Sequence, residues 1–185
     1  AIQDSSSQGD VQTLMNRLKE STCIFLCVSG ELLSEESNGN LMSVARKAGV
    51  TRMREFLVNL SNQLSDDKRP FPIVLLVTKY DQCYQRERES LIADIKQLFE
   101  PLFVTDQDWL VMLCPVSLGK ELSENPVSGE INPKNLHLPL IFALYAKLRE
   151  SIQEKQGELE QCRINLSNLR NRNGLVRWFN SHQEE

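Results

Sequence analysis

The feature that most constrains the fold is an unbroken run of five aliphatic residues at positions 73–77, Ile-Val-Leu-Leu-Val. Pro70 and Pro72 bound the run on its N-terminal side. A short apolar run of this kind predicts a strand that is buried on both faces, which is typical of a parallel sheet covered by helices. Ligands of such sheets bind beyond the carboxyl ends of the strands, where residues 78–81 follow.

Two further apolar runs, at residues 23–28 and 109–114, predict two more buried strands. Segments with apolar residues at helical spacing lie between the three runs, and they predict helices over the ranges 41–48, 51–64 and 91–99, after an amphipathic helix at 11–18. This alternation predicts an α/β fold with three layers, in which a mostly parallel sheet is flanked by helices and joined by right-handed crossovers.

Residues 78–81 read Thr-Lys-Tyr-Asp, which resembles the [N/T]KxD guanine-recognition motif of GTP-binding G domains. In that family the motif also follows a buried strand. The resemblance implies that Asp81 accepts hydrogen bonds from the N1–H and the exocyclic amine of guanine. It also implies that the stem of Lys79 lies over the base and that Thr78 ties the loop to neighbouring elements. An ionised carboxylate only accepts hydrogen bonds, so it suits guanine and mismatches adenine.

A second point of resemblance follows the third strand, where residues 117–119 read Ser-Leu-Gly. G domains close the guanine pocket at this place with a loop similar to S-A-[KL]. The resemblance implies that a backbone N–H, that of Leu118, donates to guanine O6, and a backbone donor tolerates leucine in place of alanine. The guanine-binding residues predicted in this way are Thr78, Lys79, Asp81, Ser117 and Leu118. Residues 120–135, rich in Gly, Pro, Ser and Asn, are predicted to form a loop.

The phosphate-binding sequence G-x-x-x-x-G-K-[ST] does not occur in the chain. The resemblance therefore covers only the second half of a G domain of the P-loop NTPase type, over residues 10–150. We expect a P-loop half upstream in a longer protein, since the chain opens without an initiator methionine. The alternatives are a pseudo-GTPase that acts as an interaction module, and another nucleotide-binding α/β protein in which residues 78–81 are incidental.

The expected ligand is GTP or GDP, with Mg²⁺ only where the phosphate-binding half is present. Hydrolysis needs groups that this sequence lacks, so no catalytic residue is predicted. The net charge of −4 gives no basic field that would favour nucleic acid, and no apolar run approaches the ~20 residues of a membrane span. The five cysteines have no zinc-binding spacing, and Asp106 and Asp108 are interpreted as a solvated turn. Together these features favour a reducing, cytoplasmic location.

A long final helix is predicted from Leu138-Pro139 to an end near Asn173-Gly174. Its buried stripe is predicted to be Ile141, Leu144, Tyr145, Leu148 and Ile152. Near-heptad spacing continues through Leu159, Cys162, Leu166 and Leu169, with Lys155 as the one break. We therefore divide the chain into a G-domain-like region at 1–150 and a helical extension at 151–185. Because the sheet is too small to cover this helix, the extension is expected to bind a protein partner or its own copy, and the apolar cluster at 175–179 to fold back or dock.

Overall fold

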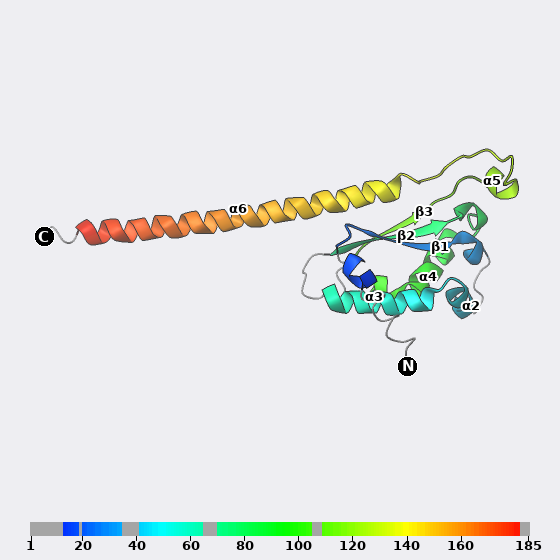
Figure 1. Cartoon of the computed structure of the whole chain (residues 1–185), viewed down its shortest axis with the longest axis horizontal. Coiled ribbons are helices and arrows are strands. Elements are labelled where there is room, and N and C mark those ends of the chain that lie inside the picture. The colour runs from blue at the N-terminus through cyan, green and yellow to red at the C-terminus, as the bar shows by residue number, and fades with distance from the viewer. Residues whose placement is uncertain (1–12, 19, 35–40, 65–69, 105–108, 182–185) are drawn as a thin grey trace. The chain divides into compact units, whose positions relative to one another are not determined.

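The computed structural model describes residues 13–18, 20–34, 41–64, 70–104 and 109–181, and the side chains of these residues except at 63, 64, 123 and 172–181. The chain divides into two units, Ala1–Leu144 and Tyr145–Glu185, and each is described by itself. The first unit contains the three strands, and the second consists of most of the last helix (Figure 1). The boundary lies six residues before the one expected from the sequence.

The three strands form one parallel sheet in the order β1-β2-β3. The strands are β1 (Ile24–Ser29), β2 (Phe71–Thr78) and β3 (Trp109–Pro115). Leu75 at the centre of β2 pairs with Leu26 on one side and with Leu113 on the other. The prediction of three parallel strands flanked by helices is confirmed, and the ends of each strand lie within two residues of the predicted bounds.

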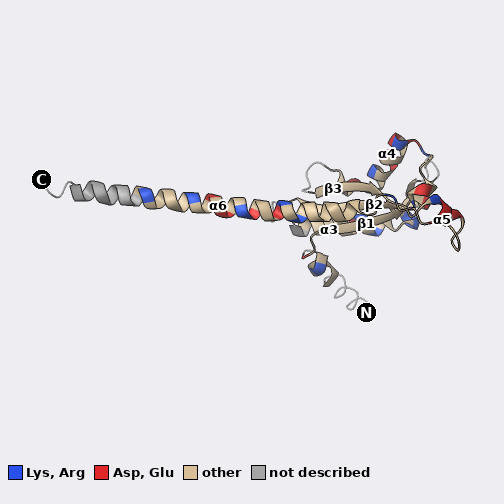
Figure 2. Cartoon of the chain, turned by 90° about the horizontal axis from the view of Figure 1, so that it is seen from above, with Lys and Arg blue, Asp and Glu red and all other residues tan. Residues whose placement is uncertain are grey.

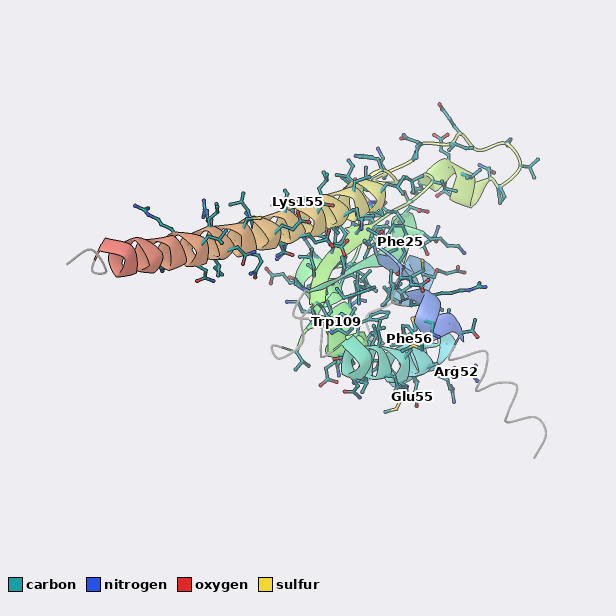
Figure 3. The ribbon with its side chains drawn as sticks, turned by 60° about the vertical axis from the view of Figure 1, so that its left-hand side comes forward. Phe25, Arg52, Glu55, Phe56, Trp109 and Lys155 are labelled. Carbon is teal, nitrogen blue, oxygen red and sulfur yellow. The ribbon has the colours of Figure 1, made fainter. Side chains whose placement is uncertain are left out.

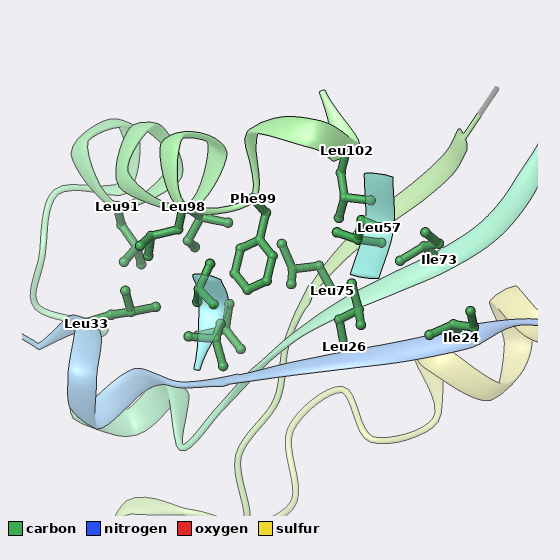
Figure 4. Packing of buried hydrophobic residues seen from close by; sticks show 14 of the residues in the cluster. Ile24, Leu26, Leu33, Leu57, Ile73, Leu75, Leu91, Leu98, Phe99 and Leu102 are labelled. Carbon is green, nitrogen blue, oxygen red and sulfur yellow. The ribbon is translucent and has the colours of Figure 1, made fainter. Parts of the chain in front are cut away.

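The longer helices between the strands cover one face of the sheet, and they lie on the same side of it in Figure 1. These are α3 (Val50–Leu64), which follows the short helix α2 (Leu41–Lys47), and α4 (Arg88–Leu98), which leads into the 3-10 turn η3 (Glu100–Leu102). Alternate residues of β2 face these helices. Figure 4 shows the resulting cluster, in which Ile73, Leu75, Leu57, Leu98 and Phe99 are almost inaccessible to solvent. Full burial of each such side chain contributes about 1.5–3 kcal/mol to folding.

The opposite face of β2 is also buried, which confirms the prediction made from its apolar run. Val74 is fully buried there beside Cys114, and Leu76 packs against the same cluster. Leu138 and Phe142, from the first turns of α6 (Leu138–Ser181), pack against it as well. Successive side chains of a strand point to opposite faces, so β2 needs apolar residues at every position.

The buried stripe predicted for the last helix is wrong. Ile141, Leu144, Tyr145, Leu148 and Ile152 are each between 55 and 66% exposed. The first turns of α6 instead turn Leu138 and Phe142 toward the β2 and β3 cluster. Apolar spacing shows that one face of a helix avoids water, but it does not show which neighbour covers that face.

Two other expectations along this part of the chain also need correction. The helix does not end near Asn173-Gly174 but continues to Ser181, because one glycine costs a helix only about 1 kcal/mol and no proline follows it. The predicted loop at 120–135 opens with a short helix, α5 (Lys120–Glu124). Asp106, Asp108, the first residues of the predicted helix at 11–18 and the side chains of 175–179 lie outside the described residues. No described helix is both long enough and apolar enough to cross a membrane.

Candidate functional site

The loop after β2 begins with two residues that fix its path. The Thr78 hydroxyl donates a 3.4 Å hydrogen bond to the Val28 carbonyl of β1, which is the tie to a neighbouring element that was predicted for this position. Lys79 then adopts the left-handed conformation, with φ of 50°, and starts the 3-10 turn η2 (Tyr80–Gln82). This reversal turns the chain sharply at the carboxyl end of the sheet.

Two backbone hydrogen bonds join this loop to the loop that follows β3. The Val116 N–H donates to Val77 O at 2.9 Å, and the Tyr80 N–H donates to Val116 O at 3.1 Å. Val116 is buried, so water competes little for these bonds. The two segments predicted to form a guanine site are therefore held side by side by the backbone, whatever side chains they carry.

The second loop is braced from its far side by residues 132–134. The Lys134 N–H donates to Ser117 O at 2.9 Å, and the Asn132 N–H donates to Leu118 O at 2.8 Å. Gly119 has a φ of 114°, and a Cβ added there would lie 3.1 Å from the Asn132 nitrogen. Glycine is needed at this position for both reasons. Within the described part of the chain, the Leu118 N–H donates to no acceptor.

All five predicted site residues line one cavity of about 440 Å³. Thr78, Lys79 and Asp81 come from the β2 loop, and Ser117 and Leu118 come from the β3 loop. Apolar walls are added by Val116, Leu122 and Leu136. A volume of this size, with mostly apolar walls and a few polar groups, is typical of sites for small organic ligands.

A second cavity of about 410 Å³ shares Asp81, Ser117 and Gly119 with the first. Its remaining walls are more strongly charged and include Lys120, Glu130 and Lys134, in and beyond α5. Figure 2 shows the acidic and basic residues gathered at this end of the first unit. Asp81 and Ser117 are thus shared by an apolar cavity and a charged one.

The charged groups of the β2 loop have partners close by. The Lys79 ammonium donates to Glu31 Oε2 at 2.6 Å, although both side chains are more than half exposed. Asp81 Oδ2 accepts from the Gln82 amide at 3.2 Å on the exposed side. Neither contact removes Lys79 or Asp81 from the cavity wall.

The sequence interpretation missed two residues that position the site. Gly30 opens the 3-10 turn η1 (Gly30–Leu33) after β1, and a Cβ there would lie 2.6 Å from the Lys79 carbonyl oxygen. The sequence indicated the role of Gly30 only by placing a glycine directly after a predicted strand. Arg86 is the second. Its guanidinium donates to Leu33 O at 3.0 Å and to Asp94 Oδ2 at 2.8 Å, so it connects η1 to α4.

All five cysteines are free thiols. Burial raises the pKa of Cys23 to about 11, and it also raises the pKa of Cys83 and of Cys114. These three thiols therefore carry little thiolate at neutral pH and act as small apolar side chains. Among the described residues, no group of His, Cys, Asp and Glu has a geometry that would hold a metal ion.

No protein-family model, no curated protein and no solved structure matches this chain. The class that the structure itself defines is an α/β protein with a three-stranded parallel sheet, flanking helices and a long C-terminal helix. Function has to be argued from the site.

Proposed function

We propose that this chain binds the base of a guanine nucleotide, GTP or GDP, as part of a G domain. The observation that carries the proposal is that Thr78, Lys79 and Asp81 line one cavity together with residues 117–118, from the end of the adjacent strand. The strands are parallel and in the order 1-2-3, so both loops lie at their carboxyl ends, where ligands of such sheets bind.

In this proposal the Asp81 carboxylate reads the base by accepting from the N1–H and the exocyclic amine of guanine. The N–H of Leu118 donates to O6, and the apolar walls hold the ring. The Lys79 stem covers one side of the base while its ammonium group stays with Glu31. Phosphate binding, Mg²⁺ and hydrolysis require the P-loop half, so the site on this chain is proposed for base recognition alone. A cytoplasmic location belongs to the same proposal.

The test is an NMR titration of the whole chain with GDP, ADP and XDP, for the native protein and for Asp81→Asn. Asparagine can donate to the carbonyl that xanthine has in place of the amine. The preference should therefore change from GDP to XDP by roughly 10- to 100-fold, since a hydrogen bond to a charged group contributes about 1.5–3 kcal/mol. The amide signals of residues 79–81 and 117–119 should shift with GDP and not with ADP.

Glu130→Gln is the matched control, because it also replaces a carboxylate by an amide but lies only in the neighbouring charged cavity. It should keep the preference for GDP. Equal GDP binding by the native protein and by Asp81→Asn, or equal shifts with ADP, would remove Asp81 from the role of base reader.

A second candidate function is a nucleotide-independent interaction module. The observation that favours it is the row of exposed apolar residues along α6, which continues beyond residue 150. Failure of all three nucleotides to perturb residues 78–81 and 117–119 would favour this function over the first.

A further inference from the structure

The second unit of the chain is a helix that leaves apolar residues in water. Every residue from 151 to 171 is exposed in the second unit described by itself. Isolated helices are only marginally stable in water, and most gain their stability by burying one face. The side chains along α6 are drawn in Figure 3, which labels Lys155.

The exposed residues follow a strict seven-residue repeat rather than a general scatter. One set of positions, called a, is spaced seven apart, and the other, called d, lies three residues after each a. We call the following eight residues the seam: Tyr145, Ile152, Leu159 and Leu166 at a, with Leu148, Lys155, Cys162 and Leu169 at d. Six of them are large apolar residues, between 53 and 66% exposed. A repeat of this period is the pattern of a left-handed coiled coil.

The charges beside the seam determine which partner fits it. The positions after d, called e, are occupied by Arg149, Gln156, Arg163 and Arg170, whereas the g positions before a are Ser151, Glu158 and Asn165. In an antiparallel pair the e positions of the two helices face one another, which would place arginine against arginine. In a parallel pair g faces e of the other copy, which places Glu158 beside the second copy's Arg163.

Lys155, at a d position, is the one charged residue in the seam. Its ammonium donates to both carboxylate oxygens of Glu158, at 2.8 and 2.7 Å. In a two-stranded seam the lysine stem can bury its methylenes while the ammonium reaches the edge and stays with Glu158. A third strand would bring a third ammonium into the same layer, so two strands suit this residue best.

We propose that residues 145–169 form a parallel, in-register, two-stranded coiled coil with a second copy of this chain. The paired segment is roughly 37 Å long at about 1.5 Å per residue. This inference stands independently of nucleotide binding, because it uses no residue of the cavity.

The first test measures the mass of the whole chain in solution by light scattering. The native protein should be a dimer, and Leu159→Asp and Leu166→Asp should each convert it to a monomer. Ile164→Asp is the matched control, since Ile164 is also exposed, at 47%, but lies at the f position on the outer face, and it should remain dimeric. A monomeric native protein, a trimer, or a dimer that survives both seam substitutions would overturn the proposal.

The second test determines orientation with the cysteine that is already in the seam. In a parallel in-register pair Cys162 faces its own copy, so mild oxidation should give a disulfide-linked dimer. Cys27→Ser removes the other exposed thiol, and Cys162→Ser should abolish the cross-link. Leu169→Cys in a Cys162→Ser background should cross-link as well. In a parallel pair both positions lie against the same position of the second copy, whereas in an antiparallel pair only one position can do so. Failure to cross-link at either position would therefore contradict a parallel arrangement.

Discussion

Gly30 and Lys79 lie so close together that a Cβ on Gly30 would be 2.6 Å from the Lys79 carbonyl oxygen. The same Cβ would also be 3.0 Å from the Thr78 carbonyl oxygen. The turn after β1 therefore supports the backbone of the β2 loop directly, at the residues that line the proposed base pocket. Because Gly30 has no Cβ, the backbone of the β2 loop can approach it closely, and this contact determines where Lys79 and Asp81 lie.

We predict that Gly30→Ala displaces the β2 loop and lowers stability by about 1–3 kcal/mol, which is the usual cost of forcing extra volume into a packed site. Chemical denaturation measures the stability, and the amide NMR signals of residues 78–81 report the displacement. Gly157→Ala is the control for the loop signals, which it should leave unshifted because a Cβ there meets nothing within 4 Å. A Gly30→Ala protein with native stability and unshifted loop signals would show that the β2 loop does not depend on this contact.

The buried ion pair between Arg86 and Asp94 should contribute far more to stability than the exposed pair between Lys79 and Glu31. The side chains of Arg86 and Asp94 are 5% and 13% exposed, against 59% and 62% for the other pair. Asp94→Asn leaves a buried guanidinium without its counter-charge, so we expect a loss of about 3–5 kcal/mol. Glu31→Gln should cost only about 0–1 kcal/mol.

Urea unfolding of the two variants side by side provides the measurement. Similar losses for both would mean that solvent reaches Arg86 as freely as it reaches Lys79, contrary to the burial described here. In that case the Arg86–Asp94 pair would not be a buried connection between η1 and α4.

The thiol of Cys23 should react slowly with alkylating reagents, and its ionisation should lower the stability of the fold at high pH. Its pKa is raised by burial from 9.0 to about 11, so at about pH 8 it should react with an alkylating reagent about 100-fold more slowly than an ordinary thiol. The folded chain holds this proton more tightly than the unfolded chain does. The stability it contributes is therefore complete below about pH 9 and is lost as the pH rises toward about 11.

Mass spectrometry of the modified protein gives the rate for each cysteine, with exposed Cys27 as the internal reference. The loss at high pH is measured as the difference in unfolding free energy between the native protein and Cys23→Ala. That difference should change between about pH 9 and about pH 11. A constant difference across this window would mean that Cys23 titrates alike in both states.

The three strands and the helices between them could be predicted because their patterns need no knowledge of a neighbour. Five aliphatic residues in a row leave β2 no polar face, so burial on both sides follows from the sequence alone. Two features could not be predicted in this way, namely the contact between Gly30 and Lys79 and the face that α6 turns toward the sheet. The closeness of Gly30 to Lys79 depends on how two loops 50 residues apart approach each other, and local sequence carries no signal of that distance.

The face of α6 was misassigned for a related reason. Ile141 and Tyr145 belong to the same apolar repeat, and that repeat was expected to face the sheet, yet Leu138 and Phe142 take the positions that pack there. A repeat that continues from Ile141 to Leu169 has to be explained over its whole length. Its seven-residue period fits a second helix better than it fits a short sheet.

Lys155→Leu should therefore strengthen self-association of α6. Burial of a leucine contributes about 1.5–3 kcal/mol, so we expect the dimer to dissociate at least about tenfold less readily, as measured by sedimentation at equilibrium. A polar seam residue fixes register at a cost in stability, so removing it should also weaken the choice of orientation. Cross-linking through Cys162 should then become less complete even though the dimer is tighter. Ile164→Leu, on the outer face, should change neither quantity, and an unaltered affinity for Lys155→Leu would place residue 155 outside the contact between the two helices.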